Sequence, residues 1–202
     1  MHIAILLFDD VDLLDAGGPY EVLLTANRLA VRAGDGEPFE VDTVSIDGGS
    51  VTAYGGLVLT PSASAEVLER TDVLIVPGAV DLSDVRADDD LSAAIGRVAG
   101  REEATLASVC TGSFLLGDAG LLDGLPWTTH WEDVDDLAAV VGTGGATRGV
   151  RWVDAGRVIT GGALSSGIAM ALHLVARFAS HDLAERTARQ IDYVWTEESA
   201  VG

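Results

Sequence analysis

The chain of 202 residues has no lysine, and its twelve basic residues are all arginine. Against them stand 32 acidic residues, so the formal net charge is −20. Such a charge repels phosphate backbones and anionic lipids, which argues against nucleic acid or a membrane surface as a partner. The acids are spread through apolar-patterned segments, which is typical of a folded protein with a strongly hydrated surface. This surface suits a salt-rich (halophilic) cytoplasm and predicts a loss of structure when salt is removed.

Cysteine occurs only once, as Cys110. A single thiol excludes an intrachain disulfide framework and a cysteine-cluster zinc site. His2, His173 and His181 form no metal-ligand spacing with one another or with Cys110, so we expect no metal. Apolar runs are too short to span a bilayer, and the N-terminus lacks the basic segment of a signal peptide. We therefore expect a soluble, cytoplasmic protein.

Strand-like apolar runs alternate with helical patterns along the chain. Ile3 to Phe8 and the run after Asp72 are continuous and apolar, which predicts strands buried on both faces of a sheet. A helix is predicted from Pro19 to Val31, with proline in its first turn. Further helices are predicted at 62–70, 91–99, 132–141, 161–178 and 182–195, short strands at 51–54, 57–60 and 126–131, and a hairpin at 150–160. The alternation predicts a single α/β domain over 1–202, with helices on both faces of a mostly parallel sheet.

Cys110 lies between a strand-like run and a helical pattern within Ala104 to Gly117. Gly112 and Ser113 leave room for a tight reversal, as expected for a nucleophile on a sharp strand-to-helix turn. There the N–H groups of a helix N-terminus would stabilise a thiolate and lower the thiol pKa. The alternative is a buried cysteine that packs as a small hydrophobe, and this window does not decide between the two.

Three loops should meet beyond the carboxyl ends of the strands, where ligands bind in such sheets: those after Phe8, after Val76 and at Cys110. With these loops in view, the chain resembles the ThiJ/PfpI superfamily, whose fold is like that of class I glutamine amidotransferases. The segments that carry the resemblance are Leu6 to Val22, Val76 to Gly78, Ser108 to Ser113, Ala119 to Gly124, Thr128 to Trp131 and Ile159 to Gly162. The isocyanide hydratase branch is the most similar. AraC-type regulators share most of these motifs but continue into a DNA-binding domain, which is not expected in a chain that ends at Gly202.

The resemblance implies a flavodoxin-like domain and a cofactor-independent hydratase that converts a small isocyanide to an N-formamide. Cys110 would attack the isocyanide carbon to form a thioimidate. Asp15 would hold or relay the thiol proton, for which burial should raise its pKa. Taken without the resemblance, Asp15 is better explained as a helix cap or one more surface acid.

Other residues match the family pattern less specifically. Thr111 matches the residue whose hydroxyl and N–H lie beside the nucleophile; otherwise it is an ordinary helix cap. Gly78 and Ala79 match the loop whose backbone N–H groups receive developing negative charge, although the family usually has a second glycine where Ala79 stands. Gly162 and Leu164 match a helix start near the substrate pocket, with a core role as the alternative for Leu164.

Histidine is absent from the position after the cysteine, where peptidase-like members carry it; Thr111 occupies that place and argues against a Cys–His hydrolase. His130 matches a histidine near the cysteine of the stress-protein branch, but we favour a structural role for it. Two other functions stay open: a stress protein that acts on reactive carbonyls or senses oxidation through Cys110, and a non-enzymatic ligand-binding domain of the regulator type. The resemblance also implies a homodimer, for which the apolar final helices offer a surface.

Overall fold

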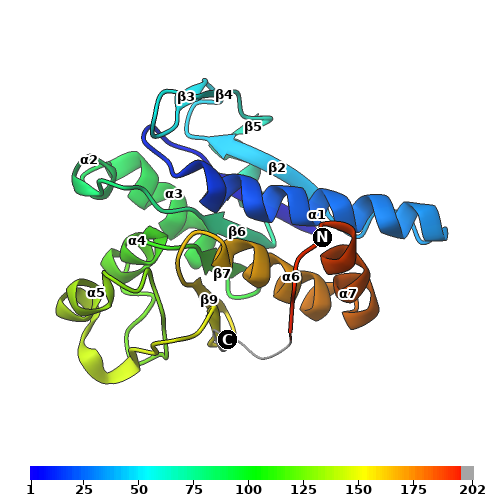
Figure 1. Cartoon of the computed structure of the whole chain (residues 1–202). Helices are drawn as coiled ribbons and strands as arrows, with labels where there is room; N and C mark the ends of the chain where they lie inside the picture. The colour runs from blue at the N-terminus through cyan, green and yellow to red at the C-terminus, as the bar shows by residue number, and fades with distance from the viewer. Residues whose placement is uncertain (197–202) are drawn as a thin grey trace.

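A mostly parallel sheet of seven strands forms the centre of the described chain, residues 1–196, in the computed structural model (Figure 1). Its spatial order is β5-β2-β1-β6-β7-β9-β8, and only the β8–β9 pair is antiparallel. The strands are β1 (His2–Leu6), β2 (Glu40–Ser45), β5 (Ala63–Ser64), β6 (Val73–Val76), β7 (Thr105–Ser108), β8 (Trp152–Asp154) and β9 (Val158–Gly161). A separate antiparallel pair joins β3 (Val51–Thr52) to β4 (Val58–Leu59). The predicted sheet architecture is confirmed.

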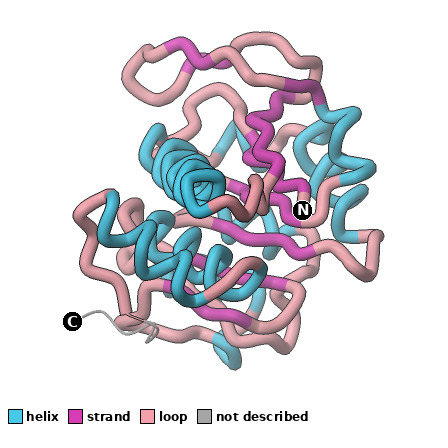
Figure 2. The backbone as a smooth tube through the Cα atoms, turned by 90° about the vertical axis from the view of Figure 1, so that its right-hand side faces the viewer, coloured by secondary structure: helices cyan, strands magenta, loops and turns pink. Residues whose placement is uncertain are grey.

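Helices lie on both sides of this sheet (Figure 2). They are α1 (Leu13–Ala33), α2 (Ser83–Arg86), α3 (Asp89–Ala99), α4 (Gly112–Asp118), α5 (Val134–Val141), α6 (Ser166–Phe178) and α7 (His181–Gln190), with 3₁₀ helices η1 (Ala65–Arg70) and η2 (Thr143–Gly145). The three helices α1, α6 and α7 pack against one another, and α3 packs against η1. Among the described residues, no helix is both long and apolar enough to cross a membrane.

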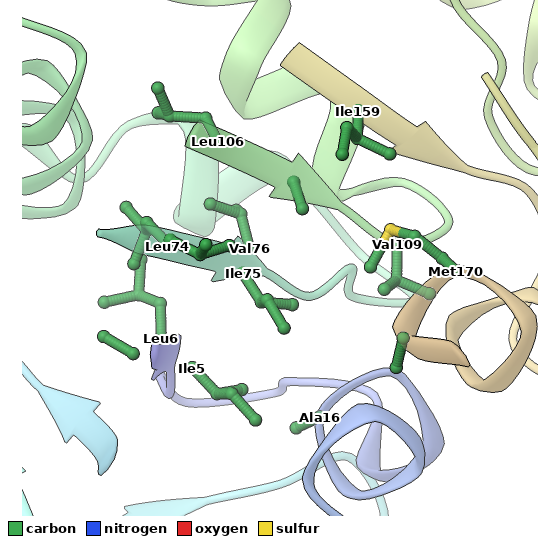
Figure 3. Close-up of a cluster of buried hydrophobic side chains, with 14 of the residues drawn as sticks. Ile5, Leu6, Ala16, Leu74, Ile75, Val76, Leu106, Val109, Ile159 and Met170 are labelled. Atoms are coloured by element: carbon green, nitrogen blue, oxygen red, sulfur yellow. The ribbon is translucent and has the colours of Figure 1, made fainter. Parts of the chain in front are cut away.

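The core lies where the central strands meet the helices. Every residue of β1, β6, β7 and β9 is buried, which explains why these strands are largely apolar on both faces. Side chains from neighbouring strands, such as Ile5 and Ile75, gather with Ala16 of α1 and Met170 of α6 (Figure 3). Each such aliphatic side chain contributes about 1.5–3 kcal/mol by leaving water. The core therefore fixes the strand ends at which the predicted site residues lie.

The first helix begins earlier than predicted. The Asp12 side chain accepts the N–H of Leu14 at 3.2 Å and caps the helix, so α1 starts at Leu13 and Pro19 lies inside it. The prediction that Pro19 opens the helix is therefore wrong. Asp15 consequently lies in the first helical turn instead of a loop.

Four other predicted segments or boundaries also differ from the structure. The segment 126–131 forms only an isolated bridge, between Trp127 and Ala146, and the next helix starts at Val134. The predicted helix at 62–70 is a short strand followed by a 3₁₀ helix, and the final helix ends at Gln190. The end of the predicted domain, residues 197–202, lies outside the described residues.

Candidate active site

Cys110 forms a left-handed turn between β7 and α4. Its φ angle of 54° is in the region that residues with side chains rarely adopt, at a cost on the order of 1–3 kcal/mol. Its N–H donates to the carbonyls of Gly161 at 3.1 Å and Gly162 at 2.9 Å. On the other side, the hydroxyls of Ser113 and Thr129 donate to the Cys110 carbonyl at 3.0 and 2.9 Å. These bonds hold the turn from both sides and so support the strained backbone.

Gly112 permits this turn because no side chain fits there. A Cβ atom at residue 112 would overlap the carbonyl groups of Val76 and Pro77 at the end of β6. The start of α4 therefore packs directly on the backbone that leads to Gly78. This close approach brings the Cys110 turn and the loop after Val76 together, as the sequence predicts for neighbouring parallel strands.

Asp15 is fully buried in the first turn of α1. Its Oδ2 accepts the Gly78 N–H at 3.0 Å, and among the described residues no hydrogen bond of ordinary geometry reaches Oδ1. Burial raises the pKa of Asp15 to about 7, and the negative charge of Asp12 adds to the rise. The Gly78 N–H and the side chain of Cys110 oppose it. The carboxyl is thus poised to exchange a proton near neutral pH.

The Cys110 thiol is buried as well, with 7% of the residue exposed. Burial raises its pKa to about 12, and the negative charge of Asp15 contributes to the rise. The backbone N–H groups of Thr111 and Leu164 face the sulfur and act in the opposite direction. The expectation of a lowered thiol pKa is therefore wrong, because burial and the neighbouring carboxylate outweigh the helix N-terminus. At neutral pH the sulfur keeps its proton, and Asp15 is the group able to take it.

The loop of Gly78 and Ala79 supports the pair in a different way from that predicted. The Gly78 N–H is bonded to Asp15, and the Ala79 N–H donates to Thr111 Oγ1 at 3.0 Å. The Thr111 hydroxyl in turn donates to the Ala79 carbonyl at 2.8 Å. Both N–H groups thus have protein acceptors, and the donors that face the sulfur are those of Thr111 and Leu164.

Glycine is required at position 78 for steric reasons. A Cβ atom there would lie 2.5 Å from Thr111 Oγ1 and 2.9 Å from Asp15 Oδ2, both far inside ordinary contact distance. Ala79, where the family usually has glycine, is buried and takes part in the reciprocal bonds with Thr111. The substitution is therefore accommodated without loss of the loop's hydrogen bonds.

A cavity of about 560 Å³ lies beside the Cys110 turn. Thr129, which bonds the Cys110 carbonyl, and Gly162, which accepts the Cys110 N–H, both line it. Cys110 and Leu164 are not among its lining residues, so the cavity adjoins the nucleophile across the segment 162–166. Sequence reasoning placed Gly162 near a pocket but found neither the cavity nor the role of Thr129.

His130 does not line the cavity. Its Nδ1 lies 3.1 Å from a carboxylate oxygen of Asp133, and its ring is next to that of Trp131. The contacts of His130 among the described residues are thus within its own segment, and no hydrogen bond or ion pair between its ring and Cys110 is found there. A structural role for His130 stays a prediction.

One group in the described part of the chain has the composition of a metal site: His2, Glu40 and Asp42, whose ligand atoms lie within 4.8 Å of one another. Arg70 occupies the same place, 2.8 Å from Glu40 and 3.4 Å from Asp42. His2 itself bonds Asp42 at 2.9 Å and Thr71 at 3.0 Å. The two carboxylates are thus paired with Arg70 and His2 has its own partners, in a cluster at the amino ends of the strands.

The chain is similar to known proteins in sequence and in structure. The model of the DJ-1/PfpI family matches residues 1–177. The chain is 34% identical to an isonitrile (isocyanide) hydratase of Pseudomonas putida over 96% of this chain and 78% of that protein. It is 29% identical to an HTH-type transcriptional regulator of Pseudomonas aeruginosa over 95% of this chain, but spans only half of the regulator. A ThiJ/PfpI family protein of Pseudomonas syringae superposes with a TM-score of 0.81 at 27% identity, covering 95% of this chain and 74% of that one.

Proposed function

The chain belongs to the DJ-1/PfpI family, and on that premise we propose that it is a cysteine-dependent hydratase converting a small isocyanide to an N-formamide. The observation that carries the proposal is the buried pair of Cys110 and Asp15. With a pKa of about 7, Asp15 is ionised in part of the molecules at neutral pH, and its carboxylate then lies next to a thiol that keeps its proton. Such a pair delivers a nucleophile and a proton in the same step.

In the first step, the sulfur of Cys110 attacks the terminal carbon of the isocyanide as Asp15 takes the thiol proton. The carbon gains electron density as the new C–S bond forms, and Asp15 returns the proton to it. The product is a thioimidate with one hydrogen on the former isocyanide carbon. The N–H groups of Thr111 and Leu164 stabilise charge on sulfur during the transfer.

In the second step, Asp15, again ionised, takes a proton from water as the water oxygen attacks the thioimidate carbon. Asp15 passes this proton to the nitrogen, which gives a tetrahedral adduct with a hydroxyl group. Asp15 then takes the hydroxyl proton as the C=O bond forms and the C–S bond breaks, and it returns that proton to the sulfur. The N-formamide leaves, so that one water has been added overall. All steps use Cys110 and Asp15, and the proposal therefore requires no cofactor.

The test is turnover of cyclohexyl isocyanide at high salt, followed by the appearance of N-cyclohexylformamide. We expect formamide production by the parent protein and none above background by Cys110→Ala. Equal activity in the two proteins would contradict the role of Cys110. Folded protein without turnover would contradict the hydratase, and methylglyoxal consumption would then test the carbonyl chemistry of the stress-protein alternative.

A ligand-binding domain is the second candidate, favoured by the similarity to the transcriptional regulator over 95% of this chain. The cavity of about 560 Å³ has the size of a small-molecule site and suits either function. Turnover separates the two, because a binding domain would take up an isocyanide and release it unchanged.

A homodimer in the cytoplasm is part of this proposal, but the final helices do not offer the surface expected for it. The buried residues of α7, such as Leu183 and Ala184, are covered by the packing of α7 on α1 and α6. Large exposed apolar side chains lie instead on α1 and on the β3–β4 pair: Leu13, Tyr20, Leu24, Leu57 and Val58. Light scattering on the parent and on Leu24→Glu tests whether this surface holds two copies together.

A further inference from the structure

The cavity beside Cys110 carries the opposite charge from the rest of the molecule. It lies between the start of α5, the loop before β8 and the start of α6. Among the described residues, 1–196, the charged residues that line it are Arg148 and Arg151 and no acid does, although the chain has 32 acids and only twelve arginines. If the charged residues of the chain were distributed at random, acids would be expected to line the cavity more often than arginines.

The two arginines differ in how far their charge is already used. Arg148 pairs with the carboxylate of Asp135 and is half exposed. Arg151 lies with its guanidinium carbon 5.9 Å from the ring centre of Tyr193, and among the described residues no carboxylate forms an ion pair with it. The aromatic ring positions Arg151 without neutralising it. Arg151 is therefore the cation with charge available for a ligand.

Hydroxyl groups complete the polar lining. Thr128 and Ser166 line the cavity with only 2% and 5% of each residue exposed. In the described structure neither hydroxyl has a hydrogen-bond partner, whereas those of Thr129 and Ser113 are bonded at the Cys110 turn. Neither oxygen is among the buried side-chain atoms left without a partner, so both hydroxyls are open to the cavity and can donate to a bound acceptor. Trp131 and Val134 add an apolar part to the wall.

A short path of backbone bonds connects this lining to the nucleophile. The Cys110 N–H donates to the Gly162 carbonyl at 2.9 Å, and the Gly162 N–H donates to the Arg151 carbonyl at 2.8 Å. The next residues of the segment, Ala163 and Ser165, line the cavity, while the Leu164 N–H faces the sulfur. A ligand in the cavity thus touches the same segment that holds the thiol.

We propose that this cavity binds the carboxylate of an anionic substrate, with Arg151 as its principal cation and Thr128 and Ser166 as hydrogen-bond donors. The inference rests on the proposed hydratase function and names its substrate class: isocyanides that carry a carboxylate. A surface with a net charge of −20 repels such anions, so their binding needs a local cation. The planar fork of arginine matches a carboxylate with two parallel hydrogen bonds.

The experiment compares isocyanoacetate with its uncharged methyl ester at one fixed ionic strength, in the parent and in Arg151→Gln. We expect Arg151→Gln to lower kcat/KM for isocyanoacetate about tenfold or more, through KM, and to leave kcat/KM for the ester within about twofold. Arg97→Gln is the matched control, because it removes the same charge from exposed α3 and should change neither substrate. Arg148→Gln should have a smaller effect than Arg151→Gln, since Asp135 already pairs with Arg148. Equal losses for acid and ester in Arg151→Gln would overturn the inference.

A binding measurement separates this inference from the hydratase proposal. Calorimetry of isocyanoacetate with Cys110→Ala protein reports the cavity without chemistry. We expect binding that weakens about tenfold or more in the double variant with Arg151→Gln. If no protein turns over either isocyanide but this difference is found, the hydratase fails and the carboxylate site stands. Binding that is absent, or unaffected by Arg151→Gln, overturns the site whatever the turnover.

Discussion

At the Cys110 turn nearly every polar group is bonded to another group of the protein, whereas in the adjoining cavity several are left open. Around the nucleophile, the Gly78 N–H bonds Asp15, Ala79 and Thr111 bond each other, and Ser113 and Thr129 bond the Cys110 carbonyl. In the cavity, no ion pair to Arg151 and no hydrogen bond to the hydroxyls of Thr128 and Ser166 is found among the described residues, and the side chain of Arg151 contacts that of Tyr193. The two regions are in contact, since Thr129 and Gly162 belong to both.

The difference indicates a separation of tasks. A closed hydrogen-bond network holds Cys110 and Asp15 in one geometry, which suits a reaction that depends on their separation. Open donors beside it suit the binding of a ligand that supplies the missing acceptors. Chemistry and selectivity are therefore expected to respond to different substitutions, and the following predictions test that division.

The largest effect is expected from Cys110→Ala. Loss of the nucleophile should lower formamide production by at least about 10³-fold. Because the cavity does not include Cys110, the dissociation constant for isocyanoacetate should change by less than about threefold. Steady-state kinetics measure the loss of formamide production, and calorimetry measures the dissociation constant for isocyanoacetate. A large loss of binding in this variant would show that the two regions act as one.

Asp15→Asn should lower kcat/KM by roughly 10²–10³-fold, because the amide cannot take the thiol proton. In the parent, Asp15 must be ionised to act, and its pKa of about 7 makes kcat/KM fall about tenfold per pH unit below that value. The variant should lose this dependence. A pH profile of each protein checks the assignment, and an unchanged acidic limb in Asp15→Asn would assign it to another group.

The same substitution should stabilise the fold at neutral pH. Below about pH 4 the Asp15 carboxyl is protonated in both folded and unfolded chains, and the variant gains nothing from the loss of charge. Between about pH 4 and 7 only the unfolded chain ionises, so the parent loses stability relative to the variant. Above about pH 7 the difference in unfolding free energy between the variant and the parent stays constant, on the order of 2–4 kcal/mol. Urea unfolding at pH 4, 6 and 8 measures it, and a gap that does not grow with pH would contradict the raised pKa.

Gly78→Ala tests how closely packed the nucleophile region is. The added methyl group must displace Thr111 or Asp15, which should cost about 1–3 kcal/mol of unfolding free energy and lower kcat/KM about tenfold. Gly162→Ala is the comparison in the cavity wall, where the nearest atoms to a Cβ are 3.1 and 3.2 Å away and a milder effect is expected. Equal losses of stability and activity in the two variants would contradict the expected difference in packing between the nucleophile region and the cavity wall.

The smallest effect concerns the whole surface. Lowering salt from about 1 M to 0.1 M lengthens the screening distance from about 3 to 10 Å and strengthens the repulsion among the surface acids. We expect Tm to fall by several degrees at low salt. Thermal scans over this range check the prediction. A Tm independent of salt would contradict the prediction of a salt-adapted surface.

Much of the fold could be predicted because its signals are local. Buried parallel strands such as Ile3 to Phe8 are continuous apolar runs, and the turn at Cys110 is marked by the small residues that follow it. The start of α1 was misplaced because proline often opens a helix, whereas here the side chain of Asp12 does so six residues earlier.

The site was predicted less completely, because its properties arise from tertiary contacts. Burial and Asp15 reverse the shift in thiol pKa that the helix N-terminus alone predicts. The partners of the Gly78 and Ala79 N–H groups follow from the packing of α1 and Thr111 on their loop. Arg151 and Thr128 come to line one cavity only in the folded chain, where the Arg151 carbonyl accepts the Gly162 N–H before α6, and no local sequence pattern indicates this.

Pro19 removes one backbone hydrogen bond between the turn that carries Asp15 and the rest of α1. It lies four residues after Asp15 within α1, and since proline has no N–H, the Asp15 carbonyl receives no helical bond from it. The first turn is therefore joined to the rest of α1 less firmly than an ordinary turn, while the remainder stays packed on α6 and α7. In evolutionary terms, substitutions within one helical turn can move the acid relative to the thiol without repacking the helix. Relatives with different chemistries can then diverge at this turn while they keep the same scaffold.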